Sequence, residues 1–188
     1  MEDGLQCNCR YLLKHKGWAG LLMDGQDWPP ENGVKREFIT AENIEELFRK
    51  YAVPPEFDLL SIDIDGNDYW VWKTITGYRP RVVVIEYNAG AGQEKSVTIP
   101  YDPAFVWDGT DYQGASLRAL ERLGKEKGYT LIGTDRNGVN AFFVLQNLVE
   151  GNFVRRPLEE LYHHPAFKGI PGKCHPPDPK HRPWVTIS

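Results

Sequence analysis

Two apolar segments of this 188-residue chain end abruptly in side chains that can do chemistry. The first spans residues 58–68 (DLLSIDIDGND) and the second spans residues 81–88 (RVVVIEYN). A continuous apolar run of this length is typical of a parallel strand buried on both faces. Ligands of open α/β sheets bind beyond the carboxyl ends of such strands. We therefore expect the polar residues at these ends to meet at one edge of one sheet: Asp63, Asp65, Glu86 and Asn88.

These residue types can hold a divalent cation or move a proton. Carboxylate and amide oxygens are the ligands that Mg²⁺ prefers in proteins, which makes Asp63, Asp65, Glu86 and Asn88 candidate metal ligands. A bound cation can lower the pKa of a hydroxyl group, and a carboxylate can accept its proton. Asp63 and Glu86 are accordingly the candidate catalytic residues.

The same residues also have a structural interpretation. Residues 65–68 (DGND) form a good turn and helix start, in which Asp65 and Asp68 would only satisfy backbone amides. Glu86 would then be an ion-paired strand end and Asn88 a turn former. We favour the helix start for Asp68 and a functional role for Asp63.

Hydrophobic periodicity predicts an alternation of strands and helices around these segments. Strands are expected over residues 20–25, 34–40, 58–65, 81–88, 129–134 and 140–145. Helices are expected over residues 8–16, 40–52, 69–75, 115–127 and 157–162, with Thr40 or Glu42 at the start of the second. Residues 89–114 are expected to form a long irregular loop rich in aromatic side chains. The dipeptide Asn137-Gly138 predicts a hairpin turn between the last two strands.

The chain divides by composition into two parts. Residues 1–150 carry the alternating elements and are predicted to form one α/β domain. Residues 151–188 are a Pro-rich C-terminal extension, in which we expect one short helix followed by an extended tail that wraps the surface or is loose.

Composition and motifs argue against several classes of binding partner and enzyme. A net charge of −4 argues against broad nucleic-acid binding, and no apolar stretch approaches the length of a membrane span. Three cysteines without disulfide-like spacing fit a reducing compartment, and the N-terminus lacks the pattern of a signal peptide, so we expect a cytoplasmic protein. The sequence contains no G-x-S-x-G, P-loop or G-x-G-x-x-G motif for hydrolase, NTPase or nicotinamide chemistry.

The order of elements, with its final antiparallel hairpin, resembles class I S-adenosylmethionine-dependent methyltransferases. Three segments sharpen this likeness: residues 16–25 (KGWAGLLMDG), 38–44 (FITAENI) and 57–66 (FDLLSIDIDG) are similar to motifs of FkbM-type methyltransferases. The similarity covers about residues 3 to 146. It implies a Rossmann-like α/β fold, with a doubly wound and mostly parallel sheet that ends in a C-terminal antiparallel hairpin.

The resemblance also implies roles for individual residues. Asp24 would accept hydrogen bonds from the ribose hydroxyls of S-adenosyl-L-methionine, and Glu42 or Asn43 would lie near the adenine. Asp3 and Gly4 resemble the trailing part of the first glycine-containing cofactor loop. Asp63 would lie close to where the methyl group meets its acceptor, which is expected to be a small molecule.

The family's first strand and most of its Gly-rich loop should precede Asp3, so the expected fold is N-terminally incomplete. Three arrangements would resolve this: a truncated reading frame, direct pairing of the second and fourth strands, or a strand from a partner chain. The last makes homo-oligomer formation an expectation, because exposed strand edges carry unpaired backbone groups.

Three functions compete on this sequence. The first is S-adenosylmethionine-dependent O-methylation of a sugar or small metabolite, with or without a metal ion. The second is a metal-dependent nucleotide-sugar glycosyltransferase, because Asp63-Ile64-Asp65 after a buried strand also matches a metal-binding D-x-D motif. The third is a non-catalytic binding module with the methyltransferase fold.

Overall fold

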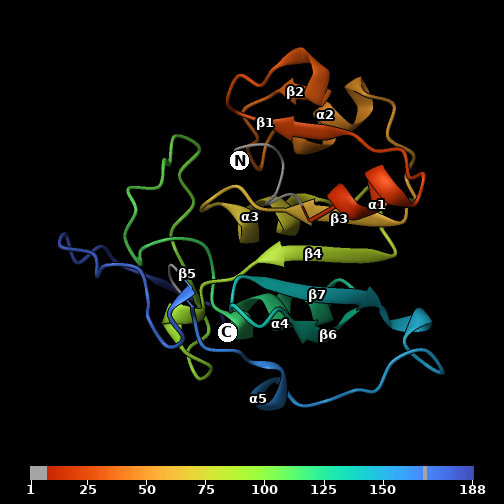
Figure 1. The fold of residues 1–188 in the computed structure, drawn as a ribbon. Coiled ribbons are helices and arrows are strands. Elements are labelled where there is room, and N and C mark those ends of the chain that lie inside the picture. Colours follow the sequence, from red (N-terminus) through yellow and green to blue (C-terminus); the bar gives the residue numbers. More distant parts are fainter. Residues whose placement is uncertain (1–7, 167–168) are drawn as a thin grey trace.

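A mixed four-stranded sheet forms the centre of the protein, which a computed structural model describes over residues 8–166 and 169–188 (Figure 1). Its strand order is β3-β4-β7-β6. The bounds are β3 (Leu59–Ile62), β4 (Val82–Glu86), β6 (Tyr129–Thr134) and β7 (Asn140–Leu145). β3 and β4 run parallel, whereas β4–β7 and β6–β7 are antiparallel. The predicted hairpin is therefore confirmed at its predicted residues.

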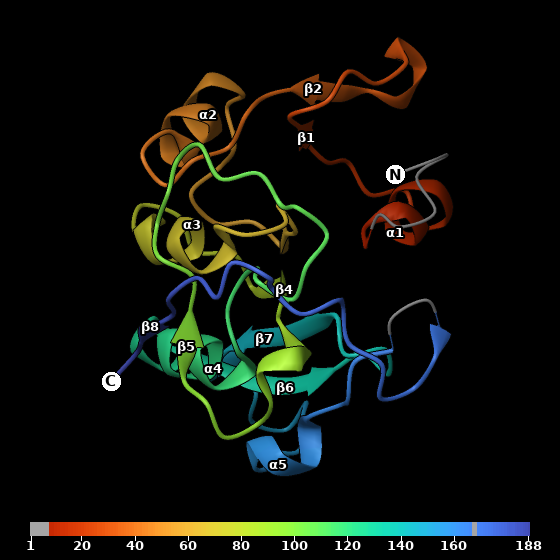
Figure 2. The ribbon, with the colours of Figure 1, turned by 90° about the vertical axis from the view of Figure 1, so that its left-hand side faces the viewer.

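Helices cover both faces of this sheet. Figure 2 shows α3 (Asp68–Thr74) and α4 (Leu117–Glu126) on one face and α1 (Arg10–His15) on the other. Trp72 of α3 packs against Phe143 of β7, with ring centroids 4.8 Å apart, and both side chains are fully buried. None of the helices in the described part of the chain is long and apolar enough to cross a membrane.

A second, two-stranded sheet lies beyond β3, on the side away from β4 (Figure 1). It pairs β1 (Leu22–Asp24) with β2 (Val34–Arg36) in parallel. Helix α2 (Ile44–Lys50) joins this part to the centre, because Ile44 and Phe48 pack in one cluster with Val71 of α3. The structure does not contain direct pairing of the family's second and fourth strands, which correspond to β1 and β3, because these two strands belong to different sheets.

The C-terminal extension is bound to the rest of the protein. Helix α5 (Leu158–Leu161) contributes both of its leucines to the main core. Strand β8 (Val185–Thr186) pairs antiparallel with β5 (Val97–Thr98), which lies inside the segment expected to be an irregular loop. Short 3₁₀ turns complete the chain at η2 (Pro30–Asn32), η3 (Ala89–Ala91) and η4 (Gln146–Leu148).

The structure corrects several predicted bounds. β2 ends at Arg36 rather than residue 40, β3 ends at Ile62 rather than residue 65, and α2 begins at Ile44. The fold is α/β, as expected, but the two parallel strand pairs fall in separate sheets and the larger sheet is mixed. The predicted single, mostly parallel sheet is therefore not confirmed among residues 8–166 and 169–188, and only the α/β class is.

The close approach of α4 to the sheet depends on the missing side chain of Gly124. A Cβ at this position would lie 2.8 Å from the buried ring of Phe143. We expect Gly124→Ala to lower the free energy of unfolding by about 1–2 kcal/mol, because the overpacking exceeds the gain in helix propensity. Gly133→Ala, whose Cβ would meet no atom within 4 Å, is the matched control. Urea unfolding of both variants tests this, and a Gly124→Ala protein as stable as the control would contradict it.

Candidate active site

The loop between β3 and α3 is shaped by a buried carboxylate. Asp68 has no exposed surface, and its side chain accepts hydrogen bonds from the backbone amides of Ile64 (3.0 Å) and Gly66 (2.9 Å). Asp65 between them has a φ of +59°, in the left-handed region that aspartate tolerates better than most residues. The predicted helix cap at Asp68 is wrong, because α3 begins at Asp68 itself and Asn67 precedes it. Asp68 does bind backbone amides, but they belong to the preceding loop rather than to the helix.

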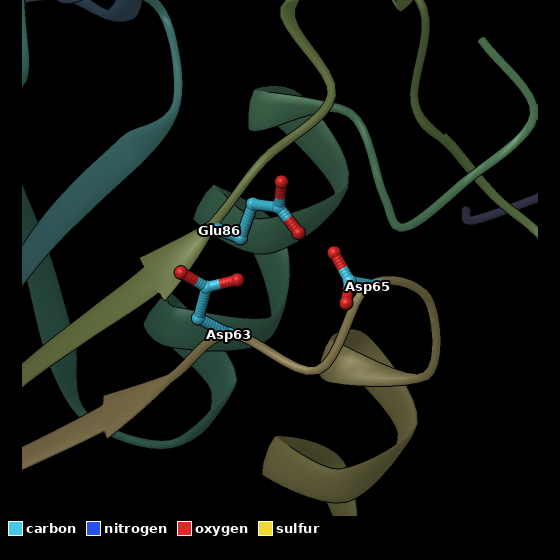
Figure 3. A group of neighbouring side chains, drawn as sticks. All are labelled: Asp63, Asp65 and Glu86. Atoms are coloured by element: carbon cyan, nitrogen blue, oxygen red, sulfur yellow. The ribbon is translucent and has the colours of Figure 1, made fainter. Parts of the chain in front are cut away.

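This loop brings two acidic side chains against the end of β4. Asp63, Asp65 and Glu86 each offer a carboxylate oxygen, and these atoms all lie within 4.8 Å of one another. Figure 3 shows the three side chains turned toward a common point, Asp63 and Asp65 from the loop after β3 and Glu86 from β4. Asp63 and Asp65 are exposed, whereas Glu86 is half-buried. The predicted meeting of these two strand ends is therefore confirmed.

Burial, together with the crowding of negative charge, raises the pKa values of two acids at this edge, Asp68 and Glu86. Burial, followed by the charge of Asp63, raises the pKa of Asp68 to about 7. Burial also raises the pKa of Glu86 well above its usual value, and the charges of Asp68, Asp63 and Asp65 add to this effect. One oxygen of Glu86, Oε2, is buried without a hydrogen-bond partner. Such a group is stabilised by a proton or by a cation.

Asn88 lies next to the cluster but has a structural task. Its side chain is buried, and its Nδ2 donates to the carbonyl oxygens of Asp111 (2.7 Å) and Gln113 (2.9 Å). This residue therefore fixes residues 111–113 beside the end of β4. Its predicted part as a metal ligand stays a prediction.

Asp24, the predicted ribose ligand, is the last residue of β1 and interacts with the acidic cluster. Its Oδ1 accepts a hydrogen bond from the amide of Gln26 (2.8 Å). Burial raises the pKa of Asp65, and the charge of Asp24 raises it further. The predicted cofactor residue and the acidic cluster therefore act on one another electrostatically.

The two residues predicted near the adenine, Glu42 and Asn43, form hydrogen bonds with other groups of the protein. The Glu42 carboxylate accepts a hydrogen bond from the Tyr101 hydroxyl, which brings the loop after β5 over the start of α2. The Asn43 side chain accepts from the amide of Thr40 (2.8 Å) and donates to the carbonyl of Phe38 (2.8 Å). Asn43 immediately precedes α2, and its side chain makes no capping hydrogen bond to the helix. The predicted alternative Thr40 accepts the backbone amides of the turn that leads into α2, that of Asn43 with Oγ1 (3.3 Å) and that of Ile44 with its carbonyl oxygen (3.2 Å). Asp3 and Gly4 lie outside the described residues.

A pocket of about 200 Å³ opens beside Glu86. Its lining includes Asp111 and Gln113 from the loop before α4, and Cys174 and His175 from the C-terminal extension. None of these four residues was expected to lie at the ends of β3 and β4. Residues 89–114 were expected to be a long loop of the kind that often carries function, which was the only signal for the first pair.

Comparison with known proteins assigns the chain to a family. The methyltransferase FkbM domain family matches residues 10–131, well over half of the chain and somewhat less than the sequence motifs suggested. No curated protein and no solved structure matches. The segments that carry the family match include β1, β3 and β4, whose ends hold Asp24, Asp63 and Glu86. The chain therefore belongs to the FkbM methyltransferase family.

Proposed function

We propose that this protein is an S-adenosylmethionine-dependent methyltransferase that methylates a hydroxyl oxygen of a sugar or another small metabolite with the help of a divalent cation. The observation that carries the proposal is the convergence of Asp63, Asp65 and Glu86 in a chain of the FkbM methyltransferase family. The cofactor, the acceptor oxygen and the metal ion are each inferences from these residues.

The fold supports this proposal. In Figure 1 the strands follow one another in space as β2, β1, β3, β4, β7 and β6. We infer that the two sheets are parts of one doubly wound, Rossmann-like arrangement with a C-terminal antiparallel hairpin. Its carboxyl edge then carries both the cofactor residue Asp24 and the acidic cluster.

Asp24 is the proposed ligand of the cofactor ribose. A carboxylate is a good acceptor for the two hydroxyls of a ribose. The interaction of Asp24 with Asp65 supports a short path from the ribose to the acidic cluster. Glu42 and Asn43 remain the proposed neighbours of the adenine, and Asp3 and Gly4 of the amino-acid end. The cofactor supplies an electrophilic methyl group on a positively charged sulfur.

The acidic cluster fits a cation of the size of Mg²⁺. Two oxygens on opposite sides of Mg²⁺ are about 4.2 Å apart, close to the spread of at most 4.8 Å among the ligand atoms of Asp63, Asp65 and Glu86. The orphaned Oε2 of Glu86 is a further reason to expect a positive partner. A cation here would lower the pKa of a nearby acceptor hydroxyl.

Glu86 is the proposed base for the case in which no cation is bound, because a carboxylate that ligates a metal ion is not free to accept a proton. A base works best when its pKa lies near the working pH, and burial moves the pKa of Glu86 in that direction. Glu86 would take the proton of the acceptor hydroxyl, and S-adenosylmethionine, when bound, would supply the methyl group to the acceptor oxygen and leave as the neutral thioether. Asp63 positions the acceptor from the other strand end.

Cofactor binding tests the first part of the proposal. We expect S-adenosylhomocysteine to bind the full chain in calorimetry and Asp24→Asn to weaken binding by at least about tenfold, because a charged acceptor is lost. Asp27→Asn is the control, since Asp27 forms an exposed ion pair with Arg36 (2.9 Å). Binding of a UDP-sugar with Mn²⁺ instead would favour the glycosyltransferase, and binding of neither would favour a non-catalytic module.

Metal-binding measurements test the proposed divalent cation at Asp63, Asp65 and Glu86. We expect Mg²⁺ or Mn²⁺ to raise the unfolding temperature and Asp65→Asn to weaken metal affinity by at least about tenfold. Asparagine also tolerates the left-handed conformation at residue 65, so the backbone should be kept. Asp58→Asn, at an exposed ion pair with Arg81, is the matched control. Equal affinities of the Asp65 and Asp58 variants would remove the metal from the proposal.

The raised pKa of Glu86 gives stability a pH dependence of known sign. Because the folded carboxyl holds its proton more tightly than the unfolded one, this group lowers the free energy of unfolding as pH rises from about 4.3 through the folded pKa. Glu86→Gln cannot ionise, so without metal we expect the stability of this variant relative to the native protein to increase as pH rises. Urea unfolding at several pH values, with the exposed Glu94→Gln as control, measures this. A stability difference that shrinks as pH rises would contradict the assignment.

A further inference from the structure

The segment between β5 and α4 lies against the loop between β3 and α3. Figure 2 shows this segment, in green, running from β5 past α3 toward α2. The carbonyl oxygen of Asp102 accepts hydrogen bonds from the Asn67 side chain (2.8 Å) and from the amide of Phe105 (2.9 Å). The turn at residues 102–105 is therefore attached directly to the start of α3.

The ring of Phe105 occupies the space that a side chain at position 66 would need. A Cβ on Gly66 would lie 2.4 Å from both Cδ1 and Cε1 of this ring. Gly66 is buried, and its φ is not in the left-handed region, so its backbone conformation would accept other residues. The packing of Phe105, rather than the backbone conformation, therefore requires glycine here.

Two contacts hold Asp65 in its unusual conformation. Its φ of +59° costs free energy in a residue other than glycine and persists only where the surroundings impose it. The first contact is made by Asp68, which binds the amides of Ile64 and Gly66 on either side of Asp65 along the chain. The second is made by Phe105, which covers Gly66. The place of the Asp65 carboxylate in the acidic cluster therefore depends on both contacts.

The C-terminal extension supports Phe105 in turn. The Phe105 ring lies 6.4 Å from the Tyr112 ring, measured between centroids. Tyr112 is buried, its ring centroid lies 5.2 Å from that of Trp184, and its hydroxyl donates to the carbonyl of Pro183 (2.9 Å). The guanidinium of Arg182 lies 4.1 Å from the centroid of the same Tyr112 ring. Residues outside the FkbM match therefore reach the loop between β3 and α3 through two aromatic side chains.

We propose that Phe105 is a positioning residue of the acidic cluster: by packing on the turn after Asp65, its ring keeps the Asp65 carboxylate facing Glu86. The side chain of Phe105 has no polar atom, so it acts through Asp65 and is not itself a ligand. Any effect of Phe105 on metal binding rests on the proposed function, whereas the placement of Asp65 does not.

A double-mutant cycle without metal tests the contact between Phe105 and Gly66. Gly66→Ala should lower the urea midpoint of the native chain, because its methyl group and the Phe105 ring compete for one space. In the Phe105→Ala background, the same substitution should leave the midpoint unchanged or raise it, because that space is then open. An equal fall of the midpoint in both backgrounds would overturn the proposal.

Metal affinity tests the position of Asp65. In calorimetry with Mn²⁺ on the full chain, Phe105→Ala should weaken binding by about five- to tenfold, because the turn that carries Asp65 is no longer held. Phe105→Leu keeps an apolar side chain over Gly66 and should stay within about twofold of the native affinity. Phe153→Ala, which removes an exposed ring from the C-terminal extension, is the control and should change nothing.

A second cycle separates positioning from a general loosening of the fold. If Phe105 acts through Asp65, Phe105→Ala should change Mn²⁺ affinity by less than about twofold in the Asp65→Asn background. A loss of equal size in both backgrounds would assign the effect to another part of the protein and refute the inference. So would an unchanged Mn²⁺ affinity of Phe105→Ala in the native background.

Hydrogen exchange distinguishes this inference from the proposed function. The amide of Gly66 donates to Asp68 (2.9 Å), and in metal-free protein Phe105→Ala should speed the exchange of this amide by at least about tenfold relative to Phe153→Ala. If the native chain binds no Mn²⁺ but this exchange accelerates, the proposed metal site fails and the positioning role of Phe105 stands. If the native chain binds Mn²⁺ and Phe105→Ala changes neither affinity nor exchange, the inference alone is refuted.

Discussion

The buried carboxylate of Asp68 organises the candidate site. It has no exposed surface, yet it lies among other acids, and burial raises its pKa to about 7. Its two oxygens hold the amides of Ile64 and Gly66, and this closes the loop so that Asp63 and Asp65 face Glu86. Placing this acid in the interior costs free energy, which the hydrogen bonds to the loop offset only in part.

This arrangement of carboxylates favours the binding of a cation or a proton at the edge of the sheet. Three carboxylates converge within 4.8 Å, and the buried Oε2 of Glu86 has no protein partner. Proteins relieve such crowding by protonation or by binding a cation, and both bear on the transfer of a proton from an acceptor. The acidic cluster lies within the residues that match the methyltransferase family, so electrostatics and family membership both indicate this edge of the sheet as the candidate site.

The C-terminal extension shows how a sequence outside the family match becomes part of a site. Its leucines on α5 enter the main core, its last strand pairs with β5, and Arg182 binds the loop before α4. Several modest interactions distributed along the extension hold it across the end of β4.

The sequence by itself determined the elements with strong local signals. Apolar runs located β3 and β4, the Asn137-Gly138 turn located the hairpin, and helical periodicity located α3 and α4, because these signals arise between residues close along the chain. The convergence of Asp63, Asp65 and Glu86 also followed, since neighbouring parallel strands end at one edge. Only the tertiary structure decided the rest. Strands β5 and β8 are too short to show a period, and the separation of β1 from β3 concerns pairing rather than pattern. The contacts of residues 174–182 with the site join residues more than sixty positions apart, so no local spacing could have revealed them.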